Sequence, residues 1–195
     1  MALAHTILAT LGSNALSGYD LWKKFSQCSG HYWQASQQQI YRELSKLEKQ
    51  GALSFEMVAQ EGRPDKKAYS MTPKGKAMLI GWITEPSSPA AIREELLVKV
   101  VAGHLVPLET VIGEIQRRKQ LHQTQLADYR EAEAEKFSDL TQLPLDKKCM
   151  YLTLRRGIRL ETQWVEWCDE AIAMLKEHSE QDQKQELLEG LNSLK

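Results

Sequence analysis

Four polar side chains recur between residues 36 and 50 at steps of four, three and four: Gln38, Arg42, Ser45 and Lys49. At 100° per residue they share one side of a helix, opposite the aliphatic residues Ile40, Leu44 and Leu47. Amides can pair with adenine, guanidinium groups with guanine, and ammonium groups with phosphate. No carboxylate interrupts the middle of this face. The pattern favours a nucleic-acid contact; the alternative is the ordinary solvated face of an amphipathic helix.

The same helix has a recognisable start and stop. Ser36 with Gln39 three residues later is the pattern of a capping box, and Gly51 is a typical C-terminal stop. Tyr41 and Lys46 flank the polar face. The candidate DNA-contacting residues of this helix are therefore Ser36, Gln38, Gln39, Tyr41, Arg42, Ser45, Lys46 and Lys49.

No other set of side chains has a spacing that indicates catalysis or metal binding. The five histidines are scattered, and the three cysteines include no closely spaced pair. The sequence contains no phosphate-binding loop, nucleophile elbow or dinucleotide fingerprint. We therefore expect no enzyme activity, no cofactor and no metal. We expect His104 to be a packed core histidine and His122 to be solvated.

The polar face belongs to the third of three predicted helices. Apolar residues at helical spacing indicate a first helix over residues 3–11, and Ser17 with Asp20 resembles a capping box that starts a short second one. Residues 53–57 then alternate between apolar and polar, which is strand periodicity, and residues 68–71 are the predicted return strand. Thr72 and Pro73 start a fourth helix that runs to Trp82.

The predicted turn of this hairpin is cationic. Residues 62–67 contain Arg63, Lys66 and Lys67, and we expect all three to contact DNA. Three helices followed by a β-hairpin is the order of a winged helix-turn-helix, in which the later helix enters the major groove. A cationic loop beside it can reach the DNA backbone or a narrow minor groove.

A proline-rich and serine-rich stretch at residues 85–89 predicts a domain boundary. Residues 1–85 form the predicted DNA-binding domain, with ten Lys and Arg against seven Asp and Glu. Residues 86–195 form a predicted dimerisation domain with 15 against 19. A basic front half is a mild indication of an anionic partner. With no membrane span and no secretory signal in the sequence, we expect a cytoplasmic protein that associates with the nucleoid through DNA.

The back half shows helical patterns almost throughout. Residues 90–105 are apolar enough to predict a helix buried between other elements. Pro107 starts a long polar helix to about Leu140, and Pro144 separates it from another that runs to about Glu189. The predicted fold is mainly α with a small β-hairpin: an N-terminal winged helix-turn-helix followed by long antiparallel C-terminal helices.

The last helix carries two apolar stripes about 100° apart, more surface than one partner helix covers. The stripes provide the candidate dimerisation residues Tyr151, Leu154, Ile158, Leu160, Trp164, Val165, Trp167, Ile172, Met174 and Leu175. We favour a homodimer, because symmetric dimers are the commonest assembly. The alternative is that the helix over residues 90–105 covers the second stripe within one chain.

Several motifs in this order resemble the PadR family of bacterial transcriptional regulators. They are the segments 17–21 (SGYDL), 33–36 (WQAS), 39–44 (QIYREL) and 62–64 (GRP), with Lys67, Tyr69, Thr72, Pro73 and Gly75. Residues 97–105 and the helix with Trp164 and Trp167 resemble the family's longer C-terminal region. Ala35 and Gln38 stand where the family often has proline and glycine, so a base preference cannot be carried over.

The resemblance implies a homodimer whose winged helices bind a two-fold-related operator in double-stranded DNA. Many family members are repressors that a small molecule, for example a phenolic acid, releases from DNA. The alternatives are a transcriptional activator of the same family and a winged-helix protein–protein adaptor. An effector would bind between the wing module and the helical tail, where the candidate residues are Trp82, His104, Trp164 and Trp167.

Overall fold

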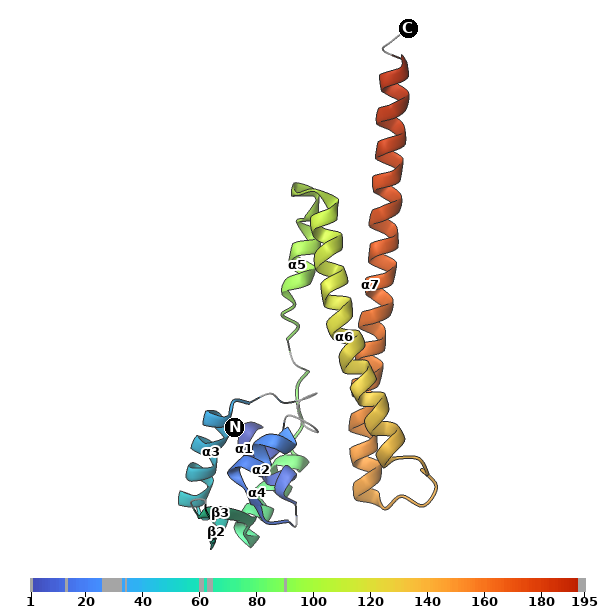
Figure 1. The fold of residues 1–195 in the computed structure, drawn as a ribbon. Coiled ribbons are helices and arrows are strands. Elements are labelled where there is room, and N and C mark those ends of the chain that lie inside the picture. Colours follow the sequence, from blue (N-terminus) through green and yellow to red (C-terminus); the bar gives the residue numbers. More distant parts are fainter. Residues whose placement is uncertain are drawn as a thin grey trace. The chain divides into compact units, whose positions relative to one another are not determined.

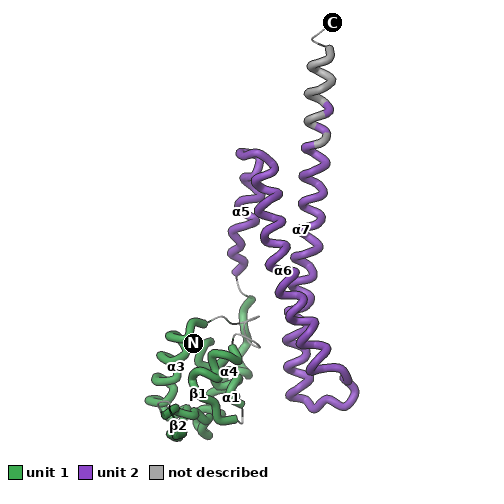
Figure 2. Tube along the Cα trace, in the orientation of Figure 1, with its two compact units in different colours: residues 1–90 green, residues 91–195 purple. Residues whose placement is uncertain are grey.

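The computed structural model describes residues 2–12, 14–25, 33, 35–59, 62, 65–89 and 91–192. They form two compact units, residues 1–90 and 91–195 (Figures 1 and 2). The division falls next to the proline-rich stretch at residues 85–89, and each unit has hydrophobic clusters of its own. None of the described helices is long and apolar enough to cross a bilayer.

The first unit combines four helices with a small sheet. Its elements are α1 (Ala2–Leu11), β1 (Leu16–Ser17), α2 (Gly18–Lys24), α3 (Gln37–Lys49), β2 (Leu53–Val58), β3 (Lys66–Met71) and α4 (Pro73–Thr84). The antiparallel sheet has the strand order β1-β3-β2. The predicted fold class, mainly helical with a small β-hairpin, is confirmed. The two-residue strand β1 is too short for any periodicity to predict.

Aliphatic side chains from the first three helices form the core of this unit. Ile7, Leu21, Ile40, Leu44 and Leu47 are each fully buried. The apolar stripe of α3 therefore packs inward as its spacing predicts, and the opposite side of the helix faces solvent. Gly75 at the start of α4 packs so closely that a Cβ there would lie 2.2 Å from the carbonyl oxygen of Ala52.

The hairpin differs from the sequence prediction. Lys66 and Lys67 lie in β3, not on the turn, and β3 begins at Lys66 opposite Val58 instead of at Ala68. Lysine is uncommon in strands, so the residue types alone predict that the strand begins after Lys67. Cross-strand pairing and the carboxylates described below outweigh that preference. Arg63 lies outside the described residues.

The described part of the second unit has helices and connecting segments but no strand. Its elements are α5 (Glu95–Val101), the 3₁₀ turn η2 (Gly103–Leu105), α6 (Leu108–Lys136) and α7 (Leu145–Asn192). The last two form the predicted antiparallel pair of long helices (Figure 1). The predicted buried helix over residues 90–105 is wrong in extent and in burial: α5 begins only at Glu95, and Val98 and Val101 are 69% and 80% exposed.

Two hydrophobic clusters hold this unit together. Near the α6–α7 turn, Leu154 and Ile158 of α7 pack with Leu126 and Tyr129 of α6. Further along, Cys168 of α7 is fully buried with Leu96 of α5, and with Val111 and Ile115 of α6. Trp164 and Trp167 pack against this second cluster. Leu96 of α5 thus belongs to the same cluster as the two tryptophans of α7.

Candidate nucleic-acid interface

Reciprocal hydrogen bonds fix the beginning of α3. The Ser36 hydroxyl accepts a hydrogen bond from the backbone N–H of Gln39 at 3.2 Å, and the Gln39 amide oxygen accepts one from the N–H of Ser36 at 2.8 Å. Such a capping box satisfies two backbone donors that the first turn leaves unpaired. Ser36 and Gln39 are exposed, but these side chains are already engaged in positioning the helix.

The outward face of α3 is exposed along its length. Gln38, Arg42 and Lys49 form no hydrogen bond or ion pair with the described part of the chain, and each is exposed. Ser45 donates to the carbonyl oxygen of Tyr41 at 3.1 Å, and Lys46 pairs with Glu43 at 3.3 Å. The face therefore offers an amide, a guanidinium and an ammonium group that are not bonded to any described side chain.

Close packing between α2 and α3 sets the height of this face. A Cβ on Gly18 would lie 2.6 Å from the ring of Tyr41, so any other residue at this position would require that ring to move. Ser17 caps α2 by accepting from the N–H of Asp20 at 3.1 Å, and it donates to the Asp20 carboxylate at 2.6 Å. Ser17 also pairs with Ala68 in the sheet, which holds the start of α2 beside β3.

Carboxylates from two helices pair with the cations of β3. Lys66 lies 3.5 Å from Asp20, and Lys67 lies 3.2 Å from Glu48 of α3 and 3.7 Å from the ring centre of Phe55. The Ser17 hydroxyl, followed by the Lys66 ammonium, lowers the pKa of Asp20 below its ordinary value. Sequence spacing gives no signal for these pairs, because Glu48 and Lys67 are 19 residues apart.

The sequence of this chain matches known protein families along most of its length. The family model "Transcriptional regulator PadR-like family" matches residues 7–80, and the model "Virulence activator alpha C-term" matches residues 92–176. The probable transcriptional regulator Rv1176c of Mycobacterium tuberculosis is 34% identical over 187 residues, which cover 91% of this chain and 99% of that protein. This chain belongs to the PadR-like family of transcriptional regulators.

Solved structures of family members have the same fold. The Vibrio cholerae virulence activator AphA is 31% identical, with a TM-score of 0.73 over 90% of this chain and 99% of that one. Bacillus subtilis PadR in complex with operator DNA is 26% identical, with a TM-score of 0.78 over the same shares. The same protein in complex with p-coumaric acid has a TM-score of 0.72 at 25% identity, again over 90% and 99%.

In this PadR-like chain the four effector candidates are divided between the two units. Trp82 stacks on His5 within the first unit, with ring centres 4.6 Å apart. Trp164 and Trp167 meet edge to face in the second unit, 5.5 Å apart. His104 lies in η2, where it is exposed and not a core histidine, because the apolar segment around it is not buried.

His104 lines a groove of about 420 Å³ within the second unit. Its walls are mostly aliphatic, and a second imidazole, that of His178 on α7, also lines it. Among the residues that the structure describes, no three His, Cys, Asp or Glu side chains gather where they could hold a metal ion. The groove therefore offers apolar walls with two imidazoles.

The dimerisation candidates on α7 are buried to different degrees. Leu154 and Ile158 are buried within the chain, whereas Met174 is 65% exposed. The remaining candidates are partly buried: Tyr151, Leu160, Trp164, Val165, Trp167, Ile172 and Leu175. The sequence pattern gives no sign that other apolar residues of this unit are exposed, because an apolar side chain by itself predicts burial: Val98, Val101 and Leu105 near α5, and Leu145 and Leu152 on α7.

Proposed function

We propose that this PadR-like regulator binds double-stranded DNA as a homodimer, with α3 of each copy in the major groove of a two-fold-related operator. The observation that carries the proposal is the outward face of α3, where Gln38, Arg42 and Lys49 are exposed and have no partner among the described residues. An adaptor helix would need apolar anchors on that face, and only the Tyr41 ring is partly of this kind. The operator-bound structure of Bacillus subtilis PadR supports the same choice.

The hairpin adds backbone contacts in this proposal. Lys66 and Lys67 keep about 40% of their side chains exposed, so each can exchange its carboxylate partner for a phosphate. Each exchange exposes Asp20 or Glu48 near the DNA, which reduces the gain. Lys66 and Lys67 therefore act mainly on affinity and salt dependence, whereas Arg42 and Gln38 act on base preference.

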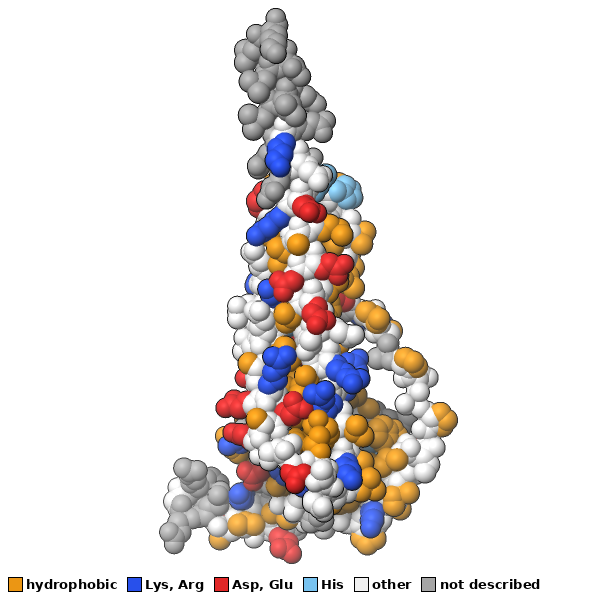
Figure 3. All heavy atoms as spheres, turned by 90° about the vertical axis from the view of Figure 1, so that its right-hand side faces the viewer, with side chains coloured by type: hydrophobic (Ala, Val, Ile, Leu, Met, Phe, Trp, Pro, Cys, Tyr) orange, Lys and Arg blue, Asp and Glu red, His pale blue; other side chains and the backbone are white. Residues whose placement is uncertain are grey.

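Homodimerisation is proposed on the exposed apolar residues of the second unit. Val98, Val101, Leu105 and Met174 are all more than 60% exposed in the single chain. Figure 3 shows hydrophobic side chains at the surface of the long helices, between charged ones. Fully burying one large aliphatic side chain is worth about 1.5–3 kcal/mol, so a few such contacts can hold a stable dimer.

The proposed regulation is repression that a small aromatic acid relieves. The supporting observations are the p-coumaric acid complex of Bacillus subtilis PadR and the groove that His104 and His178 line. Its aliphatic walls suit an aromatic ring, and a carboxylate can accept a hydrogen bond from an imidazole N–H. Val101 lines this groove and is also one of the exposed dimer candidates, so a ligand there would act directly on assembly.

Selection from random duplex DNA tests the central part of the proposal. The unmodified chain is expected to enrich one sequence with two-fold symmetry, and the enriched duplex should bind more tightly than a scrambled duplex of equal length and composition. Enrichment of a sequence without symmetry would contradict the dimeric arrangement. Equal binding to all duplexes, or none, would contradict sequence-specific DNA binding.

Titration with p-coumaric acid tests whether a small aromatic acid binds in this groove. Three groove-lining residues, Val100, Val111 and Leu175, also pack in the cluster that contains Trp164 and Trp167, so tryptophan fluorescence should report binding. A saturable change that His104→Ala weakens is expected. His5→Ala is the matched control, since His5 stacks on Trp82 in the other unit. No saturable change, or an equal loss in both variants, would remove the ligand from the groove.

A further inference from the structure

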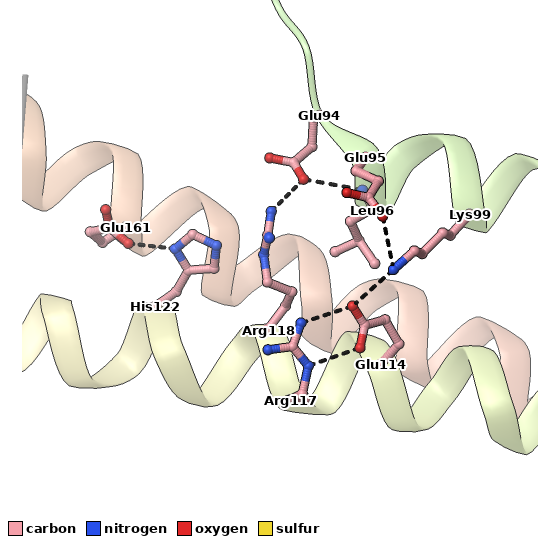
Figure 4. A network of polar contacts seen from close by, with 9 residues as sticks. All are labelled: Glu94, Glu95, Leu96, Lys99, Glu114, Arg117, Arg118, His122 and Glu161. Atoms are coloured by element: carbon pink, nitrogen blue, oxygen red, sulfur yellow. Dashed lines mark hydrogen bonds and ion pairs between the residues drawn. The ribbon is translucent and has the colours of Figure 1, made fainter. Parts of the chain in front are cut away.

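A carboxylate at the start of α5 performs two tasks. Glu94 is the N-cap residue of α5, and its Oε1 accepts a hydrogen bond from the backbone N–H of Leu96 at 3.1 Å. The same oxygen pairs with the guanidinium Nη2 of Arg118 on α6 (Figure 4). Both side chains are mostly buried, with 22% and 25% exposed. A charge-assisted bond in such a place is stronger than a surface ion pair.

Arg118 is in turn held from the side of α7. Its guanidinium carbon lies 5.8 Å from the ring centre of Trp164, within the range of a cation–π contact. Trp164 stacks on His122 with ring centres 4.9 Å apart, and His122 is bonded to Glu161 of α7. One guanidinium therefore joins the first residue before α5 to both long helices. We call the pair of Glu94 and Arg118 the linker clamp.

The linker clamp marks the place where regular structure ends on the way to the DNA-binding unit. Between the end of α4 at Thr84 and Glu94 lie residues 85–93, nine positions without a helix or a strand in their described part. The described side chains of this segment are all exposed. Nine residues can span at most about 30 Å. The linker clamp thus marks the end of the segment that has no helix or strand in its described part.

Without the linker clamp, the segment between the two units that has no regular structure would be longer. Leu96 is the one buried side chain among the seven residues of α5, and a helix of this length is not stable without tertiary contacts. Lys99 adds exposed pairs with Glu95 and Glu114, which are weak. Loss of the charge on Glu94 or Arg118 would therefore release α5 together with the linker.

We propose that Glu94 and Arg118 are positioning residues that fix the free length of the linker and thereby the operator half-site spacing that the dimer accepts. This inference rests on the proposed function, because a spacing preference requires two linked DNA-binding units. Two modules joined by a short linker bind best when the linker matches the span between their sites, and a longer linker accepts more spacings with lower effective concentration. An ion pair in the helical unit thereby determines which half-site spacing the dimer binds.

The test uses the palindrome enriched by the unmodified chain from random duplex DNA. Duplexes with the two half-sites moved together or apart by one to four base pairs, and a duplex with one half-site, are titrated with each variant. The unmodified chain should prefer one spacing by about tenfold or more. Glu94→Gln keeps an oxygen for the cap but loses the charge, and Arg118→Gln loses the cation. Both should reduce the preference to about threefold or less.

Other readouts separate positioning from general damage. Half-site affinity should be unchanged in both variants, because neither residue lies in the DNA-binding unit. Since α5 also carries Val98 and Val101 of the proposed dimer surface, sedimentation of the free protein is used to find the concentration at which each variant is dimeric, and the titrations are made there. Arg117→Gln is the matched control, because Arg117 pairs with Glu114 within α6 and does not contact the cap of α5. It should keep the original spacing preference. Arg118→Lys, which retains a cation, should restore part of it.

The inference is overturned if Glu94→Gln and Arg118→Gln keep the spacing preference of the unmodified chain. It is also overturned if half-site affinity falls by the same factor as palindrome affinity, or if Arg117→Gln has the same effect as Arg118→Gln. Failure of the proposed function gives a different result: the unmodified chain itself would then enrich no palindrome and bind no half-site.

Discussion

His122 and Glu161, which are 39 residues apart in sequence, form a direct bond between the two long helices, with Nδ1 of the imidazole 2.5 Å from Oε2 of the carboxylate. Their side chains are only 18% and 12% exposed. The expectation that His122 is solvated is therefore wrong: its position among polar residues gives no sign of the carboxylate that faces it from α7. Trp164 covers the imidazole, and this stack brings the bond next to the linker clamp.

We predict that His122→Leu lowers the stability of the helical unit because it leaves the Glu161 carboxylate without its partner in a largely buried place. Loss of one member of such a pair costs about 1–3 kcal/mol for an incompletely buried site. Urea unfolding followed by circular dichroism, at one fixed protein concentration, measures the loss.

The double variant His122→Leu/Glu161→Met is the control for this prediction. With both polar side chains replaced by apolar ones, most of the lost stability should return. If the double variant is as unstable as the sum of the two single variants, the pair is not energetically coupled and the bond has no special role.

Arg42→Ala should weaken binding to the selected operator by about 1–3 kcal/mol and relax base preference at one position of each half-site, as expected for a bidentate contact with guanine. Fluorescence anisotropy with the operator and its single-base variants measures both effects. Lys76→Ala, an exposed cation on α4, is the matched control and should change little. Unchanged affinity in a folded Arg42→Ala variant would remove Arg42 from the interface.

Lys67→Gln should act differently, since Lys67 is proposed to contact phosphate. Binding should weaken about equally on all duplexes, and the slope of log affinity against log salt should fall by about one unit. Glu48→Gln removes the competing carboxylate and should strengthen binding. A Lys67→Gln variant that loses base preference but keeps its salt slope would contradict this role.

The hairpin of long helices should lose stability at alkaline pH through Tyr129. Burial, followed by the charge of Glu161, raises the pKa of Tyr129 to about 12, whereas an unfolded chain has the ordinary value of 10.0. The folded state therefore holds this proton more tightly, and the resulting stabilisation is complete below pH 10 and is lost as pH rises towards 12. Thermal unfolding between pH 9 and 12 should show a loss that Tyr129→Phe reduces.

Tyr19→Phe serves as the control for the alkaline transition, because Tyr19 is 55% exposed in the other unit. Its unfolding profile should follow that of the unmodified chain. A Tyr129→Phe profile that is identical as well would assign the loss of stability to other groups.

Local patterns predict much of the fold. The start of α3 follows from Ser36 and Gln39, and its buried stripe follows from the spacing of Ile40, Leu44 and Leu47, because all these interactions lie within one or two helical turns. The exposed polar face of the same helix follows from the same geometry. The α6–α7 hairpin follows from two long helical patterns separated by Pro144.

Contacts between distant segments could not be predicted in this way. Glu94 and Arg118 are 24 residues apart, and only the packing of α5 on α6 brings them together. The position of Lys67 in a strand depends on its pairing with Met57 and Glu48. Apolar residues such as Val98 and Val101 indicate burial, but their sequence does not say whether the covering surface belongs to the same chain.

Charge placed on that exposed apolar surface should separate the proposed dimer without unfolding the chain. Met174→Glu is preferable to Ile172→Glu or Trp167→Glu for this purpose, because Met174 is 65% exposed whereas the other two are partly buried. Sedimentation at micromolar concentration should show a monomer with unchanged helix content and poor operator binding. Lys176→Glu, an exposed position on α7, is the control. An unmodified chain that is itself monomeric would contradict the dimer.

The stoichiometry of the operator complex tests the account most directly. Sedimentation velocity with the labelled palindrome and increasing amounts of the unmodified chain measures the mass of the complex. We predict one complex that contains two copies of the chain on each duplex and that forms without a one-copy intermediate. A saturated complex with a single copy, or a labelled palindrome that sediments as free DNA throughout, would contradict binding by a dimer with α3 of each copy in the major groove.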